Sequence, residues 1–125
     1  MSRANVEIAR RGFQEAAAGD FSVIAELLDP EVKWHGGDRT GGCQDRVQAL
    51  RFMREAAARG GVGRLVDVID AGDQVVLIIE PPVPDGTTPV RRANVSTFRD
   101  GRVVEMVAYE SPEQACAAAG VASAP

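Results

Sequence analysis

The chain has 125 residues, 45% of them hydrophobic, which suits one compact domain and is too short for two ordinary ones. Its formal net charge is −4, with 14 Lys and Arg scattered among 18 Asp and Glu, so neither nucleic acid nor an anionic membrane surface is an expected partner. The first residues lack the apolar run of a signal peptide, and no stretch reaches the roughly 20 apolar residues that cross a bilayer. We therefore expect a single cytoplasmic domain over residues 1–125.

Helical periodicity dominates the first half of the sequence. Apolar residues recur every three or four positions over Arg3–Ala18, which predicts one helix. Asp20 can cap a second, shorter helix that Pro30 terminates, and Asp45 can cap a third that runs through Ala58. The segment EVKW between the second and third helices is expected to be a short strand followed by a glycine-rich loop.

The second half changes to β-branched segments. These are RLVDVID, QVVLIIE, VRRANVSTF and RVVEMVAYE, and they are separated by the turn signals AGD, PPVPDGTTP and RDG. Four successive strands predict an antiparallel meander, and the tail from Pro112 is expected to form a short helix that frays. The fold class is therefore α+β, with a curved antiparallel sheet and three helices packed on it.

Three segments carry a resemblance to a known family. They are GDFSVIAELLDPEVKWHGG, CQDRVQALRFM and FRDGRVVEMVAYES. Together with the order of elements, they resemble the SnoaL-like branch of the nuclear transport factor 2-like superfamily, whose relatives include the ketosteroid isomerases. The resemblance implies a cone-shaped domain with a cavity between sheet and helices, a small apolar molecule as ligand, and commonly a homodimer. It does not choose a reaction, because relatives include isomerases, cyclases, epoxide hydrolases, dehydratases and noncatalytic binders.

The turn of the closing hairpin decides which side chains face this cavity, because strand residues alternate between faces. A two-residue turn at Asp100-Gly101 would pair Asn94 with Val107, whereas a three-residue loop from Arg99 would pair Asn94 with Met106. We favour the longer loop, because it forms an apolar wall with few polar groups, as small-molecule sites have. The cavity face would then carry Asn94, Ser96, Phe98, Val104, Met106, Ala108 and Glu110.

The opposite face of these two strands is also expected to be apolar. It would carry Ala93, Val95, Thr97, Val103, Glu105, Val107 and Tyr109, and the apolar residues that need cover would be Ala93, Val95, Val107 and Tyr109. An apolar sheet face of this kind needs cover from a second copy of the chain or from helices. This face is therefore the second reason to expect a homodimer.

Asn94 is unusual for a residue in the middle of a strand. Asparagine is disfavoured there, which indicates either a polar role in the cavity or a bulge or edge strand. Aligned on the closing hairpin, Asn94 falls where the related ketosteroid isomerases place a protonated oxyanion-hole aspartate, so the resemblance implies an amide that donates to a ligand oxygen. Their tyrosine donor falls near Gly12 or Phe13, and their general base at Trp34 or Gly36. Steroid isomerisation by that mechanism is therefore not expected.

Two carboxylates are candidates for proton transfer. Asp38 lies in the glycine-rich loop, where it could act as a base at the cavity mouth or simply be a solvated turn residue. Glu110 follows the last strand, where it could act as an acid or base at the cavity rim or form a surface ion pair with Arg92.

The only tryptophan and the only histidine are neighbours, Trp34 and His35. If VKW continues as a strand, Val32 and Trp34 share the inner face and Trp34 forms part of the cavity wall, while His35 points the other way with Lys33. The glycines that follow could instead turn the imidazole into the cavity, where it would suit acid–base catalysis.

No cofactor or metal is expected. Cys43 and Cys116 lie far apart in sequence and outside any CxxC or Cys/His cluster, which indicates reduced thiols. The sequence also lacks the glycine-rich motifs that bind nucleotides.

Two functions are compatible with these patterns. The first is a cofactor-independent isomerase, cyclase or hydrolase that acts on a small apolar carbonyl or epoxide compound. Its candidate catalytic residues are Asn94, Asp38, His35 and Glu110. Its candidate substrate-binding residues are Trp34, Ser96, Phe98 and Met106. The second is a noncatalytic ligand-binding or dimeric interaction domain that uses the same cavity.

Overall fold

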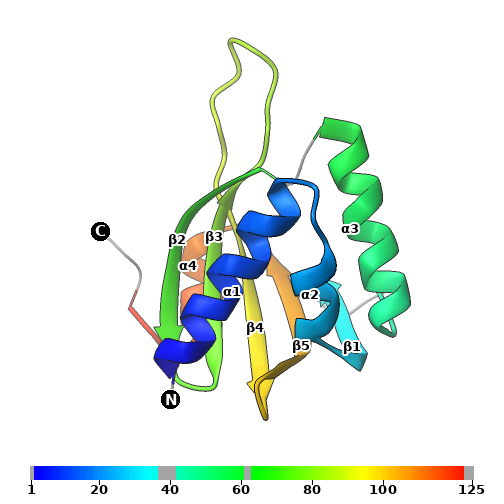
Figure 1. Cartoon of the computed structure of the whole chain (residues 1–125). Helices are drawn as coiled ribbons and strands as arrows, with labels where there is room; N and C mark the ends of the chain where they lie inside the picture. Colours follow the sequence, from blue (N-terminus) through cyan, green and yellow to red (C-terminus); the bar gives the residue numbers. More distant parts are fainter. Residues whose placement is uncertain (1, 37–41, 61–62, 123–125) are drawn as a thin grey trace.

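The computed structural model describes residues 2–36, 42–60 and 63–122, and Asp38 lies outside them. Within this part of the chain there are four helices and five strands (Figure 1). The helices are α1 (Ser2–Ala17), α2 (Ser22–Leu27), α3 (Arg46–Gly60) and α4 (Pro112–Ala119). The strands are β1 (Leu28–Gly36), β2 (Arg64–Ala71), β3 (Gln74–Glu80), β4 (Arg92–Arg99) and β5 (Arg102–Tyr109).

The strands form one sheet in the order β1-β5-β4-β3-β2. The antiparallel meander predicted for the second half is confirmed, because each of the strands β2 to β5 pairs antiparallel with the next. One pairing differs from the antiparallel arrangement, since β1 pairs parallel with β5. The chain reaches β5 only after α3 and three further strands, and a parallel pair requires a long connection of this kind.

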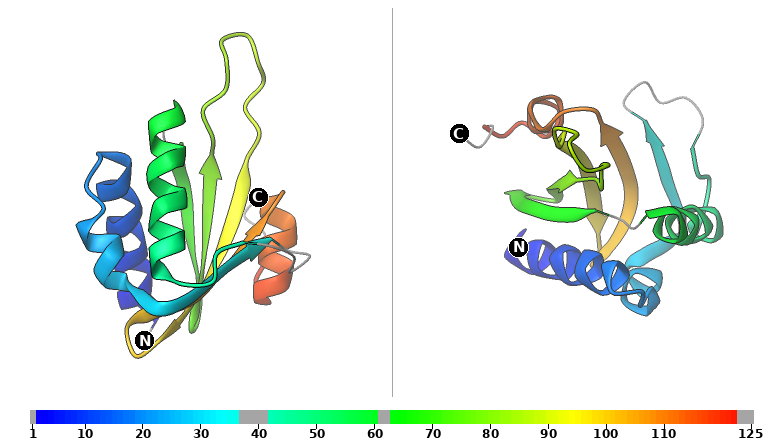
Figure 2. Two further views of the ribbon diagram at one scale, coloured as in Figure 1. Left: turned by 90° about the vertical axis from the view of Figure 1, so that its right-hand side faces the viewer. Right: turned by 90° about the horizontal axis from the view of Figure 1, so that it is seen from above.

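The helices lie on both faces of the curved sheet. Figures 1 and 2 show α1, α2 and α3 on one face and α4 on the other. The predicted three helices therefore account for one face only. The fourth helix is capped and anchored on the sheet: Ser111 accepts a hydrogen bond from the Gln114 N–H in its first turn, and Ala115 and Cys116 are both 0% exposed.

Helix α2 is shorter than the sequence suggested, and β1 follows it directly. The Asp20 carboxylate accepts hydrogen bonds from the Ser22 N–H and hydroxyl at 2.9 and 2.6 Å, and the first of these satisfies a donor at the start of α2. These bonds, the one from the Ser22 side chain first, hold the pKa of Asp20 below its usual range. Helix α2 ends at Leu27, and Pro30 lies inside β1. A proline is tolerated there because β1 is an edge strand.

The closing hairpin has a two-residue turn followed by a bulge. Asp100 and Gly101 both have positive φ, 53° and 78°, and Arg99 pairs with Arg102 across the turn. The three-residue loop was therefore wrong. The register then skips Val104, which adds one residue to β5 and reverses its alternation.

Because of the bulge, part of β5 still presents the expected side chains to the cavity. Asn94 pairs with Ala108 and Ser96 with Met106, two positions away from the pairing we favoured. Because the shift is even, Asn94, Ser96 and Met106 still share one face, as expected. Val103 takes the inward place that had been assigned to Val104, and it is 2% exposed.

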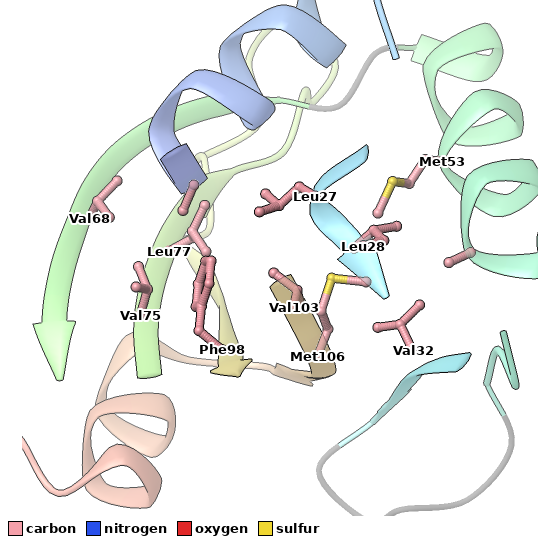
Figure 3. Close-up of a cluster of buried hydrophobic side chains, with 12 residues drawn as sticks. Leu27, Leu28, Val32, Met53, Val68, Val75, Leu77, Phe98, Val103 and Met106 are labelled. Carbon is pink, nitrogen blue, oxygen red and sulfur yellow. The ribbon is translucent and has the colours of Figure 1, made fainter. Parts of the chain in front are cut away.

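Two clusters of buried side chains lie on opposite sides of the sheet. The cluster beneath α1, α2 and α3 includes Val32, Val75, Leu77, Phe98 and Met106 (Figure 3). The cluster beneath α4 consists of Val76, Ile78, Ala93, Val95, Ala115 and Cys116. Helix α4 thus covers two of the outer-face residues on which the dimer argument depended, and the homodimer stays a prediction from the resemblance.

Candidate functional site

A cavity of about 260 Å³ lies between the sheet and the helices α1, α2 and α3. Sixteen of its lining side chains are hydrocarbon, thioether or aromatic. They are Ala9, Phe13, Ala16, Phe21, Ile24, Leu27, Leu28, Trp34, Met53, Ala56, Leu77, Ile79, Pro81, Pro82, Val103 and Met106. The other two are Asn94 and Ser96. No charged side chain of the described residues lines it, so the cavity suits a small apolar molecule with few polar atoms.

Asn94 and Ser96 form the polar spot of this cavity. They stand two residues apart on β4 and therefore on the same face. The Ser96 hydroxyl donates to Asn94 Oδ1 at 3.0 Å. Every described side-chain nitrogen or oxygen that is shut off from solvent has a hydrogen-bond partner, and Asn94 Nδ2 bonds to none of the described residues. This nitrogen is therefore open to the cavity that Asn94 lines.

Trp34 is placed by the alternation of β1. Val32 and Trp34 face inward, as predicted, and Trp34 pairs with Met106 of β5. On its other side the Trp34 backbone exchanges hydrogen bonds of 3.0 and 2.6 Å with Cys43. Gly42 allows this approach, since its φ is +94° and an added Cβ would overlap the Trp34 carbonyl oxygen.

The Trp34 ring is held from the side of α3. It meets the Phe52 ring edge to face, with centroids 5.0 Å apart and planes at 77°. Phe52 is 46% exposed, so this contact covers only part of the ring. Trp34 lines the cavity and is thus braced by a residue of α3 that does not itself belong to the lining.

His35 lies on the other face of the sheet. It pairs with Val107 in the register, and its Nε2 donates to Glu105 Oε2 at 2.9 Å. The side chains of His35 and Glu105 are 13% and 33% exposed. The imidazole is not turned inward, so the strand alternation decides between the two orientations left open by the sequence.

The remaining predicted residues are dispersed. Phe98 faces the same side as Asn94 but is buried among Val75, Leu77 and Val103, and it does not line the cavity (Figure 3). Glu110 is exposed beyond the end of β5 and is also absent from the lining. The prediction for Asp38 falls outside the described residues. Of the seven predicted site residues that the structure describes, Asn94, Ser96, Trp34 and Met106 meet at the cavity, and their roles stay predictions.

Sequence reasoning missed the residues at the cavity mouth. Pro81 and Pro82 begin the loop between β3 and β4, which Figure 1 shows projecting beyond the sheet, and both line the cavity. The turn-rich composition of the loop concealed this role. Continuing the alternation of Leu77 and Ile79 by two residues would have placed Pro81 on the cavity face.

Cys43, the backbone partner of Trp34, has a thiol with a raised pKa, because burial disfavours the thiolate and the carboxylate of Asp45 repels it.

The described residues contain no group of three or more His, Cys, Asp and Glu side chains that could hold a metal ion. None of the helices in this part of the chain is long and apolar enough to span a membrane.

The fold and cavity define a class of protein. Residues 9–106 match the family model of the SnoaL-like domain, and the chain belongs to this family. The resemblance seen in the sequence is thus confirmed. A search of curated proteins finds no match.

Solved structures with the same fold include several small proteins. Bal32a, from a soil-derived mobile gene cassette, has 24% identity and a TM-score of 0.73 over 86% of this chain and 89% of its own. A putative polyketide cyclase from Sinorhizobium meliloti has 19% identity and a TM-score of 0.68, with 82% and 93% covered. TerC, co-crystallised with polyporic acid, has 22% identity and a TM-score of 0.66, with 86% and 92% covered. Other matching structures are described as nuclear transport factor 2-like or cystatin-like, which agrees with the α+β class.

Proposed function

We propose that this SnoaL-like protein binds a small, mainly apolar molecule with a carbonyl or epoxide oxygen in the cavity beneath α1, α2 and α3. The observation that carries the proposal is the open amide nitrogen of Asn94 in a cavity lined otherwise by apolar and aromatic side chains and Ser96. An apolar body gains from burial against such a lining, and an oxygen placed at Asn94 Nδ2 keeps a hydrogen bond that it would otherwise lose on leaving water. TerC, a structural neighbour, was co-crystallised with polyporic acid, which supports a small-molecule ligand for this fold.

Noncatalytic binding is the function that the described geometry supports best. A general base must reach the reacting proton directly or through one water. His35 points away from the cavity and bonds to Glu105, and Glu110 is exposed outside the lining. Neither of these two predicted proton carriers is therefore placed to act on a molecule held by Asn94.

A cofactor-independent isomerase, cyclase or hydrolase is the second candidate. It is favoured by the same amide, because a donor that holds a carbonyl oxygen also stabilises the negative charge that develops on it during enolisation or ring closure. This function needs a proton acceptor, and Asp38 is the remaining predicted one. Turnover that disappears in Asp38→Ala while ligand binding persists would establish the enzyme.

The binding proposal is tested by titrating the protein with a small cyclic ketone and measuring the dissociation constant by calorimetry. We expect saturable binding, and about a fivefold to tenfold loss in Asn94→Ala, since one neutral hydrogen bond contributes about 1 kcal/mol. Thr97→Ala is the matched control, because Thr97 is a polar residue on the same strand that bonds instead to Gln74. Absence of saturable binding by the wild-type protein, or equal losses in both variants, would contradict the proposal.

A further inference from the structure

Ser96 makes no contact with the ligand in the proposed function, yet its side chain is more deeply buried than that of Asn94. It is 5% exposed and lies between Val75 of β3 and Met106 of β5 in the sheet register. A buried hydroxyl that donates to nothing costs free energy, and the one side-chain hydrogen bond that Ser96 makes within the described residues goes to Asn94. The Ser96 hydroxyl proton is therefore held in the hydrogen bond to Asn94 Oδ1.

This hydrogen bond fixes which end of the Asn94 amide faces a ligand. A side-chain amide has a donor end and an acceptor end of nearly the same shape, and a half-turn of its last torsion exchanges them. With Oδ1 held by the Ser96 hydroxyl, the half-turn would bring the amide nitrogen to the hydroxyl and turn the acceptor toward the cavity. Asn94 on its own would offer either end.

The geometry points to Ser96 as a positioning residue that makes the polar spot a hydrogen-bond donor, and thereby restricts the ligand to uncharged molecules with an acceptor oxygen. This inference rests on the proposed function and narrows its ligand class. The charge restriction comes from the lining: no cationic side chain of the described residues faces the cavity. A carboxylate would therefore be buried with one amide hydrogen bond and no counter-ion from the described residues, which costs more than the bond returns.

The inference is tested with three probes of one shape, namely trans-2-decalone, trans-decalin and the trans-decahydro-2-naphthoate anion. None of the three absorbs strongly where tryptophan absorbs. The chain has one tryptophan, Trp34, and it lines the cavity, so its fluorescence reports occupancy. At neutral pH we expect the ketone and the hydrocarbon both to bind, because the Asn94 amide replaces a hydrogen bond that the ketone loses on leaving water, and we expect the carboxylate to bind more weakly than either.

Substitution of Ser96 isolates the positioning role. In Ser96→Ala the ketone-to-hydrocarbon ratio of affinities should fall about fivefold, and the infrared carbonyl stretch of the bound ketone should broaden and shift toward its position in an apolar solvent. Ser96→Thr keeps the hydroxyl and should restore both readouts, which a purely structural role for Ser96 would not produce. Thr97→Ala should change neither.

The outcomes separate the inference from the function on which it rests. A ratio and a carbonyl stretch that are unchanged in Ser96→Ala, or a carboxylate that binds as tightly as the ketone, would overturn the inference while leaving the binding function intact. Failure of all three probes to bind the wild-type protein would overturn the binding function and the inference together. Unfolding midpoints of the variants show whether each one is folded.

Discussion

The two faces of the sheet are built from the same strands but differ in how completely they are filled. Beneath α4 the side chains of Val76, Ala115 and Cys116 are fully buried against one another. Beneath α1, α2 and α3 the cluster encloses a cavity of about 260 Å³. Because neighbouring residues on one strand face opposite ways, each strand contributes to both, so this fold can keep a hollow on one side while the other side is packed.

The largest contrast is expected from two neighbours on β3. Ile78→Ala leaves a new hole in the filled cluster and should lower the free energy of unfolding by about 4 kcal/mol, near the upper part of the range for such truncations. Leu77→Ala enlarges a cavity that already exists, so fewer contacts are lost and the expected loss is about 2 kcal/mol. Urea unfolding of both variants measures the difference. Equal losses would show that the cavity side is packed as tightly as the other.

Enlarging a small side chain should also affect the two faces differently. Ala115→Leu overpacks the cluster beneath α4 and is expected to destabilise the protein by about 2 kcal/mol. Ala9→Leu, on α1, adds a side chain that the cavity can accept, so the unfolding free energy should stay within about 1 kcal/mol of the wild type. Ala9→Leu should also abolish ketone binding, which Ala115→Leu should leave measurable if the protein folds.

A smaller contrast is expected from the two thiols, one on each side. Cys116 is 0% exposed and should react with a disulfide reagent only at the rate of unfolding. Cys43 is half-buried, and its raised pKa leaves little thiolate, so it should react in the native state but more slowly than a free thiol. Asp45→Asn removes the repelling charge and should speed the reaction modestly. Two thiols that react together would break the contrast.

The smallest effect concerns the turn that leads into α2. The pKa of Asp20 in the folded state lies below its ordinary value of 3.8, so the unfolded chain takes up the proton first as the pH falls. The stabilisation is therefore complete above about pH 5 and is lost as the pH falls through the folded-state pKa. Wild type should exceed Asp20→Asn slightly in stability at pH 7, and the two should converge once the pH is below the folded-state pKa of Asp20. A gap that is constant with pH would contradict this assignment.

Local patterns were sufficient for the elements and for part of the site. Helical spacing located α1 and α3, turn signals separated β2 to β5, and the alternation of Val32 and Trp34 placed the indole at the cavity. Asn94 was recognised because asparagine is out of place in the middle of a strand. Each of these signals lies within a few residues of the feature that it predicts.

The features that failed depend on contacts between distant segments. The segment RVVEM does not indicate that Val104 is left out of the pairing, because a bulge depends on how β4 and β5 pair and not on either strand alone. The parallel partner of β1 lies about 70 residues away, and so does Glu105, the partner of His35. Phe98 was placed on the correct face, but whether a face position borders a cavity or fills a core depends on which side chains arrive from other elements.

The position of α4 has a consequence for how the folded chain can open. Helix α4 follows all five strands in the chain, so it can detach from the sheet without breaking any strand pairing. Such an opening would expose Val76, Ile78 and Val95 together, an apolar surface of the kind that promotes aggregation. The packing of Ala115 and Cys116 against the sheet therefore protects the protein from association through its outer face.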